Sequence, residues 1–192
     1  MKIGVLALQG AFIEHINMLN RLNVESVEVR LPGHLEGLDA LIIPGGESTT
    51  IGKLLVDFDL LQPLREFGVK KPIWGTCAGA ILLSKDIHRD QPLLELMDLS
   101  IERNAFGRQV GSFEVDLDLS NVTGFEDNQR SFRTFFIRAP LIQSVAGDCQ
   151  ALITLPDGRI VAAQQGHLLA TSFHPELTDD DRFHRYFLEL IK

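Results

Sequence analysis

The sequence has no long apolar run and no excess of basic residues. No hydrophobic stretch approaches the roughly 20 residues of a membrane-spanning helix, so we expect no membrane partner. The apolar start at residues 1–8 breaks at Gln9 and Gly10, which favours a buried first strand over a signal peptide. With 18 Lys and Arg against 26 Asp and Glu, the formal net charge is −8. This balance argues against a nucleic-acid partner.

Cysteine is also scarce: the chain has only Cys77 and Cys149, far apart in sequence. No close pair of cysteines suggests a metal site or a redox pair, so we expect no bound metal. The sequence leaves a disulfide between them open, although free thiols in a cytoplasmic protein are the simpler interpretation. Cys149 follows Gly147 and Asp148 in a turn with no base nearby, and we interpret it as incidental.

Apolar runs alternate with amphipathic stretches in the first half of the chain. Strands are predicted at residues 2–8, 26–31, 40–44 and 72–76, and helices at 12–22, 50–58, 60–67 and 78–84. Such alternation indicates a parallel sheet with helices on both faces. The length of 192 residues, the hydrophobic content of 45% and the lack of repeats or linkers favour one domain over residues 1–192.

The second half is richer in strand signals. Strands are predicted at residues 99–103, 112–117, 134–138, 151–155, 160–165 and 168–173, a polar loop at 121–130, and a closing helix at 179–190. The Pro-Asp-Gly turn at residues 156–158 predicts a hairpin. The fold class is therefore α/β, with a mixed, mostly parallel central sheet.

A Gly-Thr-Cys-Ala-Gly turn at residues 75–79 lies between a predicted strand and a predicted helix. It has the form of a nucleophile elbow with Cys77 as the nucleophile. The glycines allow a sharp turn, and the N–H groups of the following helix can stabilise a thiolate or an oxyanion. The alternative is a buried structural cysteine, because cysteine is among the most buried residue types.

A cysteine nucleophile needs a base, and usually an acid that orients the base. His174 follows the last predicted strand, and Pro175 favours an extended backbone there. Residues i and i+2 of an extended chain share a side, so Glu176 can lie beside the His174 imidazole. The alternative is a surface turn. The other histidines are expected to be solvated or structural, with His15 and His184 as candidates for a protein interface.

A Pro-Gly-Gly-Glu-Ser-Thr loop at residues 44–49 also follows a strand. Its glycines let backbone N–H groups approach a ligand, and Ser48 or Thr49 can cap the next helix. Phosphate binding is less favoured, because the P-loop lysine and the dinucleotide fingerprint are missing. We interpret the loop as an oxyanion donor and amino-acid clamp, with a plain strand–helix turn as the alternative.

These motifs together resemble the class I, triad-type glutamine amidotransferases, and more narrowly the glutaminase subunits of pyridoxal 5′-phosphate synthase. The resemblance covers essentially the whole chain. The matching motifs are the segments at residues 6–11, 44–49, 75–79 and 174–178, and two that mark the narrower branch, 103–109 (Arg-Asn-Ala-Phe-Gly-Arg-Gln) and 136–140 (Phe-Ile-Arg-Ala-Pro). One departure is Glu95, where the family pattern has a glycine.

The resemblance implies a flavodoxin-like fold and a role for each matching residue. Cys77 would be the nucleophile, His174 the base and Glu176 its orienter. Backbone N–H groups of Gly46 and Ala78 would form the oxyanion hole. The implied glutamine-binding residues are Gly46, Glu47, Ser48, Arg103, Ile137 and Arg138. The implied activity is hydrolysis of L-glutamine to glutamate and ammonia, with no cofactor.

The resemblance also implies a partner, a barrel-shaped synthase subunit that receives the ammonia and builds pyridoxal 5′-phosphate. Residues 11–17 are a plausible contact for it, because they adjoin the site. Three other interpretations are an amidotransferase of the imidazole glycerol phosphate pathway, a former amidotransferase kept as a structural subunit, and a cysteine hydrolase of the α/β-hydrolase type. The segments at 103–109 and 136–140 argue against the first, the intact triad against the second, and an acid directly after the histidine against the third.

Overall fold

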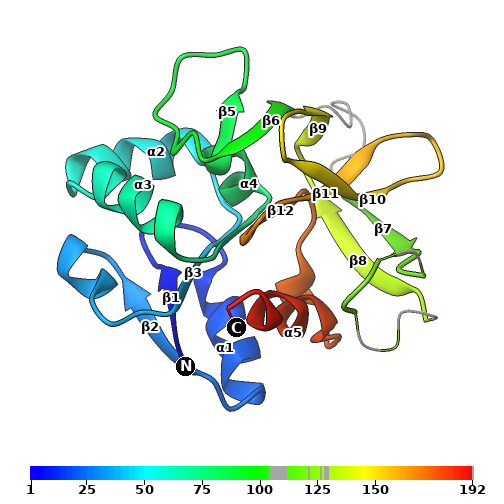
Figure 1. Cartoon of the computed structure of the whole chain (residues 1–192), viewed down its shortest axis with the longest axis horizontal. Helices are drawn as coiled ribbons and strands as arrows, with labels where there is room; N and C mark the ends of the chain where they lie inside the picture. The colour runs from blue at the N-terminus through cyan, green and yellow to red at the C-terminus, as the bar shows by residue number, and fades with distance from the viewer. Residues whose placement is uncertain (104–111, 121, 126, 128–129, 192) are drawn as a thin grey trace.

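A mixed sheet runs through the molecule (Figure 1). The structure is a computed structural model and describes residues 1–103, 112–120, 122–125, 127 and 130–191. Within these residues the strand order of the sheet is β2-β1-β3-β4-β12-β11-β9-β6-β5, with β10 paired to β11. The strands are β1 (Lys2–Leu6), β2 (Glu25–Val29), β3 (Ala40–Ile43), β4 (Ile73–Thr76), β5 (Ser84–Asp86), β6 (Met97–Glu102), β9 (Leu141–Val145), β10 (Gln150–Thr154), β11 (Ile160–Gln165) and β12 (Leu168–Thr171).

The half of the sheet that carries β1, β3, β4 and β12 is parallel throughout. Its order, β2-β1-β3-β4-β12, is the flavodoxin-type arrangement, in which ligands bind beyond the carboxyl ends of the strands. The other half is largely antiparallel, and β10 and β11 form the predicted hairpin. The predicted α/β class with a mixed sheet is thus confirmed.

Helices cover both faces of the sheet. They are α1 (Phe12–Arg21), α2 (Ser48–Asp57), α3 (Leu61–Lys70), α4 (Ala78–Leu83) and α5 (Arg182–Glu189), with short 3-10 helices η1 (Pro32–Leu35) and η2 (Pro175–Leu177). In Figure 1, α2, α3 and α4 lie on one side of the parallel strands, and α1 and α5 on the other. In the described part of the chain no helix has the length and apolar character needed to cross a membrane.

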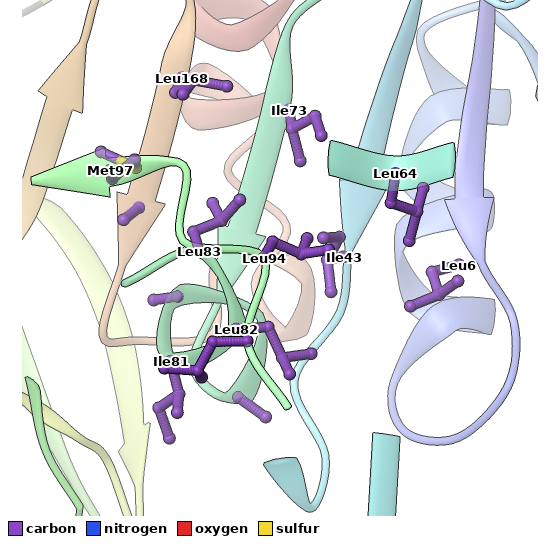
Figure 2. Packing of buried hydrophobic residues seen from close by; sticks show 14 of the residues in the cluster. Leu6, Ile43, Leu64, Ile73, Ile81, Leu82, Leu83, Leu94, Met97 and Leu168 are labelled. Atoms are coloured by element: carbon purple, nitrogen blue, oxygen red, sulfur yellow. The ribbon is translucent and has the colours of Figure 1, made fainter. Parts of the chain in front are cut away.

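Successive side chains of the buried strands point to opposite faces of the sheet and belong to two separate hydrophobic clusters. Ile43 and Ile73 join the cluster under α2, α3 and α4, whereas their neighbours Ile42 and Trp74 join the cluster under α1 and α5. Figure 2 shows side chains of the first cluster, among them Ile43, Ile73 and Leu168 of the strands and Leu82 and Leu83 of α4. Each fully buried Leu or Ile contributes about 2–3 kcal/mol, so both faces hold the parallel strands in place.

Several elements differ from the sequence-based prediction. The strands β7 (Ser112–Leu117) and β8 (Phe132–Ile137) form a two-stranded sheet of their own, where one mixed sheet was expected. The strands β5 and β9 were not predicted. The closing helix begins at Arg182 rather than at residue 179, because the Thr178 hydroxyl accepts a hydrogen bond from the Asp180 N–H and holds that stretch in a turn. Residues 121, 126, 128 and 129 of the expected polar loop lie outside the described residues.

Glu95, the departure from the family pattern, has a backbone φ of 57°. This left-handed region favours glycine, which explains why a glycine is expected at the position. The Glu95 carboxylate accepts a hydrogen bond from the guanidinium of Arg65 on α3. That ion pair gives the glutamate a contact that a glycine would lack.

Arg182, at the start of α5, anchors the chain segment that leads into β8. Its buried guanidinium donates to the carbonyl oxygens of Asp127 (2.9 Å), Arg130 (2.7 Å) and Ser131 (2.9 Å), and it pairs with Asp180 at 2.6 Å. Replacing it by alanine would remove the donor that these three carbonyls share, and would leave the Asp180 carboxylate with the Arg130 guanidinium, at 3.3 Å, as its side-chain partner. We therefore expect Arg182→Ala to lower the free energy of unfolding by about 3–5 kcal/mol, measured by urea denaturation.

The matched control is Arg185→Ala on the same helix. Arg185 pairs with Asp181 four residues earlier, and its side chain is 46% exposed. Exposed pairs of this kind contribute less than about 1 kcal/mol. Equal stability losses in the two variants would contradict the anchoring role of Arg182.

Candidate active site

A cavity of about 840 Å³ opens at the carboxyl ends of the parallel strands. It is bordered by the turns that follow β1, β3 and β4 and by the chain just beyond β12. The predicted site residues that line it are Gly46, Glu47, Ser48, Cys77, Ala78, Arg103, Ile137, Arg138 and His174. The structure thus brings together residues from five separate segments, and Glu176 lies buried behind His174.

Cys77 occupies the turn between β4 and α4 with φ 49° and ψ −104°. This conformation is strained for a residue with a side chain, as expected of a nucleophile elbow. The turn is held by a 2.7 Å hydrogen bond from the Cys77 N–H to the Thr171 carbonyl of β12. Gly75 is required for it, because a Cβ there would lie 2.4 Å from backbone atoms of Gly79. The Cys77 side chain, only 6% exposed, forms part of the cavity wall.

His174 is fixed by its backbone and by its ring. Its N–H donates to the Phe135 carbonyl of β8 at 2.9 Å, and its Nδ1 lies 2.7 Å from Oε1 of Glu176. The expected route to this contact was wrong, since β12 ends at Thr171 and Glu176 lies in the 3-10 helix η2. The tight turn of η2, rather than an extended chain, therefore brings the carboxylate to the imidazole.

The electrostatic surroundings of His174 favour its protonated form. Burial, the largest influence, lowers the pKa of His174. Hydrogen bonds with Cys77 and Glu176, together with electrostatic attraction to both residues, outweigh burial and raise the pKa of His174 to about 10. An imidazolium beside a sulfur atom is suited to stabilising a thiolate and to protonating a leaving group.

The Pro-Gly-Gly-Glu-Ser-Thr loop at residues 44–49, the twin-glycine loop, packs directly against His174 and Cys77. A Cβ at Gly45 would lie 2.3 Å from Cε1 of His174 and 3.3 Å from Cβ of Cys77, so only glycine fits there. The loop is tied to the turn after β1, because the Ala11 N–H donates to the Gly45 carbonyl at 2.9 Å. The Glu47 N–H donates to Oε1 of Gln9 at 2.8 Å. Gln9 and Gly10 therefore belong to the wall of the cavity, although the sequence marked them only through the resemblance.

Glu47 caps α2, a role that was expected for Ser48 or Thr49. Its carboxylate accepts hydrogen bonds from the N–H groups of Thr49 (3.2 Å) and Thr50 (2.8 Å). Burial raises the pKa of Glu47, but the side-chain and backbone hydrogen bonds from these threonines outweigh it and lower the pKa to about 2. The carboxylate also binds the Arg103 guanidinium at 2.9 Å, so a carboxylate and a cation stand side by side in the cavity wall.

Two further predicted residues lie at the end of β8. Ile137 is 39% exposed, and the next residue, Arg138, has a φ of 45°. Both residues lie in the cavity wall. Residues 104–109 of the Arg103 motif lie outside the described residues.

His15 and His184 were expected to be solvated or structural, with a protein interface as a candidate role, and the structure places them in the interior as structural residues. Both side chains are fully buried, and they meet behind the site, where α1 and α5 lie side by side (Figure 1). No local sequence pattern indicates this pair, because its members are 169 residues apart.

Both cysteines are free thiols, and Cys149 is buried away from the cavity wall. Burial raises the pKa of Cys149 to about 11, which disfavours a reactive thiolate there. Among the described residues, no three His, Cys, Asp or Glu side chains cluster as a metal site would require.

Comparison with known proteins gives a consistent family assignment. The chain is 57% identical to "Pyridoxal 5′-phosphate synthase subunit PdxT" of Herpetosiphon aurantiacus, over 99% of this chain and all of the relative. It is 56% identical to the protein of the same name from Moorella thermoacetica, over the full length of both. A solved structure described as a glutamine amidotransferase superposes with a TM-score of 0.90 at 49% identity, covering 98% of each chain. A family model described as the SNO glutamine amidotransferase family matches residues 5–192, and the chain belongs to this family.

Proposed function

We propose that this protein hydrolyses the side-chain amide of L-glutamine and passes the ammonia to a synthase subunit that makes pyridoxal 5′-phosphate. The observation that carries the proposal is the convergence of Cys77 and His174 on one cavity, with Glu176 on Nδ1 of the imidazole. Family membership and the names of the PdxT relatives support the choice of substrate and product.

Each residue of the site has a role in the proposed reaction. The Cys77 thiolate attacks the amide carbon, and the backbone N–H groups of Gly46 and Ala78 hold the oxyanion. Each such donor is typically worth about 3 kcal/mol in the transition state. His174 protonates the departing nitrogen, and ammonia leaves. His174 then takes a proton from water, which attacks the thioester and releases glutamate, while Glu176 keeps the ring in one orientation.

Free glutamine carries an ammonium and a carboxylate on its α-carbon, and the cavity wall offers complementary groups. Arg103 and Arg138 suit the α-carboxylate, since a guanidinium can form two parallel hydrogen bonds. Glu47, whose low pKa keeps it ionised, suits the α-ammonium. Gly46, Ser48 and Ile137 complete the proposed glutamine site along the same wall.

The proposed partner is a barrel-shaped synthase subunit that takes ammonia before water converts it to ammonium. Residues 11–17 remain the proposed contact, because α1 follows directly on the Gln9–Ala11 turn that borders the cavity. A reduced thiol at Cys77 is required for the chemistry, which suits a cytoplasmic location.

The test combines the purified chain with a candidate synthase subunit and its pentose and triose phosphate substrates. With amide-¹⁵N glutamine, we expect glutamate release to rise on addition of the synthase and ¹⁵N to appear in pyridoxal 5′-phosphate. An imidazole glycerol phosphate synthase subunit serves as the control and should give no stimulation. Equal glutamate release with either partner would contradict the proposed partner, and no release at all would contradict the proposed activity.

A further inference from the structure

A fully buried polar cluster lies behind the triad and takes no part in the chemistry described so far. It contains His15 of α1, His184 of α5 and Thr76 of β4, each 0% exposed. Nδ1 of His15 lies 3.0 Å from Nε2 of His184, and Nε2 of His15 lies 3.2 Å from the Thr76 hydroxyl. Nε2 of His15 also lies 3.5 Å from Oε2 of Glu176.

The two oxygens of the Glu176 carboxylate are in different situations. Oε1 contacts Nδ1 of His174, whereas Oε2 is buried and has no hydrogen-bond partner within the described part of the chain. A buried carboxylate oxygen without a donor is costly, by about 1–3 kcal/mol or more for a charged group. The ring nitrogen of His15 is the group placed to relieve that cost.

The charge state of the two histidines is set by their burial. Burial lowers the pKa of His15 and of His184 to about 3, and for His15 the negative charge of Glu176 offsets only part of the effect. Both rings are therefore neutral near pH 7, and each carries one N–H. The 3.0 Å contact between the rings then requires that one ring donates and the other accepts.

Only one arrangement of these protons suits the carboxylate. If His184 donates from Nε2, His15 accepts at Nδ1 and must carry its own proton on Nε2, facing Glu176. In the reverse arrangement, Nε2 of His15 would carry a lone pair, which the Thr76 hydroxyl can satisfy but which repels the carboxylate oxygen, and Nδ1–H of His184 would be a buried donor with no partner among the described residues. The first arrangement leaves only an acceptor unpaired, so it is the favoured one.

We propose that His15, held in one tautomer by His184, is a positioning residue that orients Glu176 through Oε2 and so keeps Oε1 on the His174 imidazole. The inference rests on the proposed glutaminase activity and deepens it. The rings are themselves confined by Trp74, whose ring lies 4.8 Å from that of His184 and 5.6 Å from that of His15. The packing of α1 against α5 thus fixes the geometry of the catalytic histidine from behind.

The test compares two amides at position 15, both measured with the synthase subunit present. In His15→Gln the side-chain NH₂ reaches the place of Nε2 and can still donate to Glu176. In His15→Asn it reaches only the place of Nδ1 and cannot. We expect kcat to fall by about 10–100-fold in His15→Asn with KM nearly unchanged, and to stay within about fivefold of the original protein in His15→Gln.

A spectroscopic readout separates positioning from a loss of stability and does not depend on turnover. In the isolated chain, the NMR resonance of the His174 Nδ1 proton reports its hydrogen bond to Glu176. We expect this resonance to move upfield in His15→Asn and to stay in place in His15→Gln. The control is Leu19→Ala, which empties a buried apolar position on the same helix and should lower stability without moving the resonance.

Two results would overturn the inference. One is that His15→Asn and Leu19→Ala show the same His174 resonance and the same kcat, when kcat is calculated per folded molecule. The other is an equal loss in the Asn and Gln variants. Failure of the proposed activity is seen separately, as absence of glutamate release by the unaltered protein, and the resonance would still decide whether His15 orients Glu176.

Discussion

Replacing Cys77 by alanine is expected to abolish glutamate release, with kcat reduced by at least about 10⁴-fold. The proposed reaction passes through a thioester on Sγ, and no other described thiol lies in the cavity wall. The substitution removes a single sulfur atom from a residue that is only 6% exposed. It leaves in place the flanking glycines, Gly75 and Gly79, which make the strained turn possible. We therefore expect a folded protein, checked by circular dichroism, that binds glutamine without consuming it.

Cys149→Ala is the matched control for this experiment. Cys149 is also a buried free thiol, but it lies outside the cavity wall. We expect it to retain full activity and to remain sensitive to a diazoketone analogue of glutamine that alkylates the nucleophile. Turnover in Cys77→Ala, or labelling at Cys149 in the unaltered protein, would rule out the assignment of Cys77.

The second large effect is expected for Glu176→Gln, with kcat reduced by about 10³–10⁴-fold. The amide has nearly the same shape, but it carries no charge and can present an N–H to Nδ1 of His174, which favours the wrong tautomer. The charge of Glu176 and its hydrogen bond are among the influences that raise the pKa of His174 to about 10. Their removal should therefore lower that pKa.

The sign of the pH effect follows from this shift. A raised pKa means that the folded protein holds the His174 proton from its ordinary value of 6.5 up to about 10. The stability gained from this proton is full below pH 6.5 and is lost as the pH rises through about 10. In Glu176→Gln the loss should begin at a lower pH, and an NMR titration of the His174 ring measures it directly. Glu66→Gln, at an exposed position of α3, is the control and should leave the titration unchanged.

The parallel half of the fold and the turns of the candidate site were predictable because their signals are local. The short apolar runs at β3 and β4 stand next to glycines, and each motif lies directly after such a run. The strand β5 could not be found in this way, since Ser84-Lys85-Asp86 is short and polar and has no apolar run that would mark a strand. The strand β9 has two consecutive exposed residues, so its sequence lacks the alternation of apolar and polar residues that marks a strand.

The contacts behind the site were not predictable from local patterns. His15 and His184 look like ordinary polar positions on two amphipathic helices, and their burial depends on how α1 and α5 pack on the sheet. The pairing of Glu47 with Arg103 likewise joins two distant segments. Where a side chain is satisfied by a partner far along the chain, neither spacing nor composition carries the information.

The order of strands has a consequence for synthesis of the chain. Strand β4, which leads into Cys77, is paired with β3 on one side and with β12 on the other. Until the ribosome has released β12, the growing polypeptide exposes an apolar strand edge beside the Cys77 thiol, and such edges favour aggregation. Nascent chains that stall before residue 168 should therefore be inert towards glutamine and dependent on chaperones.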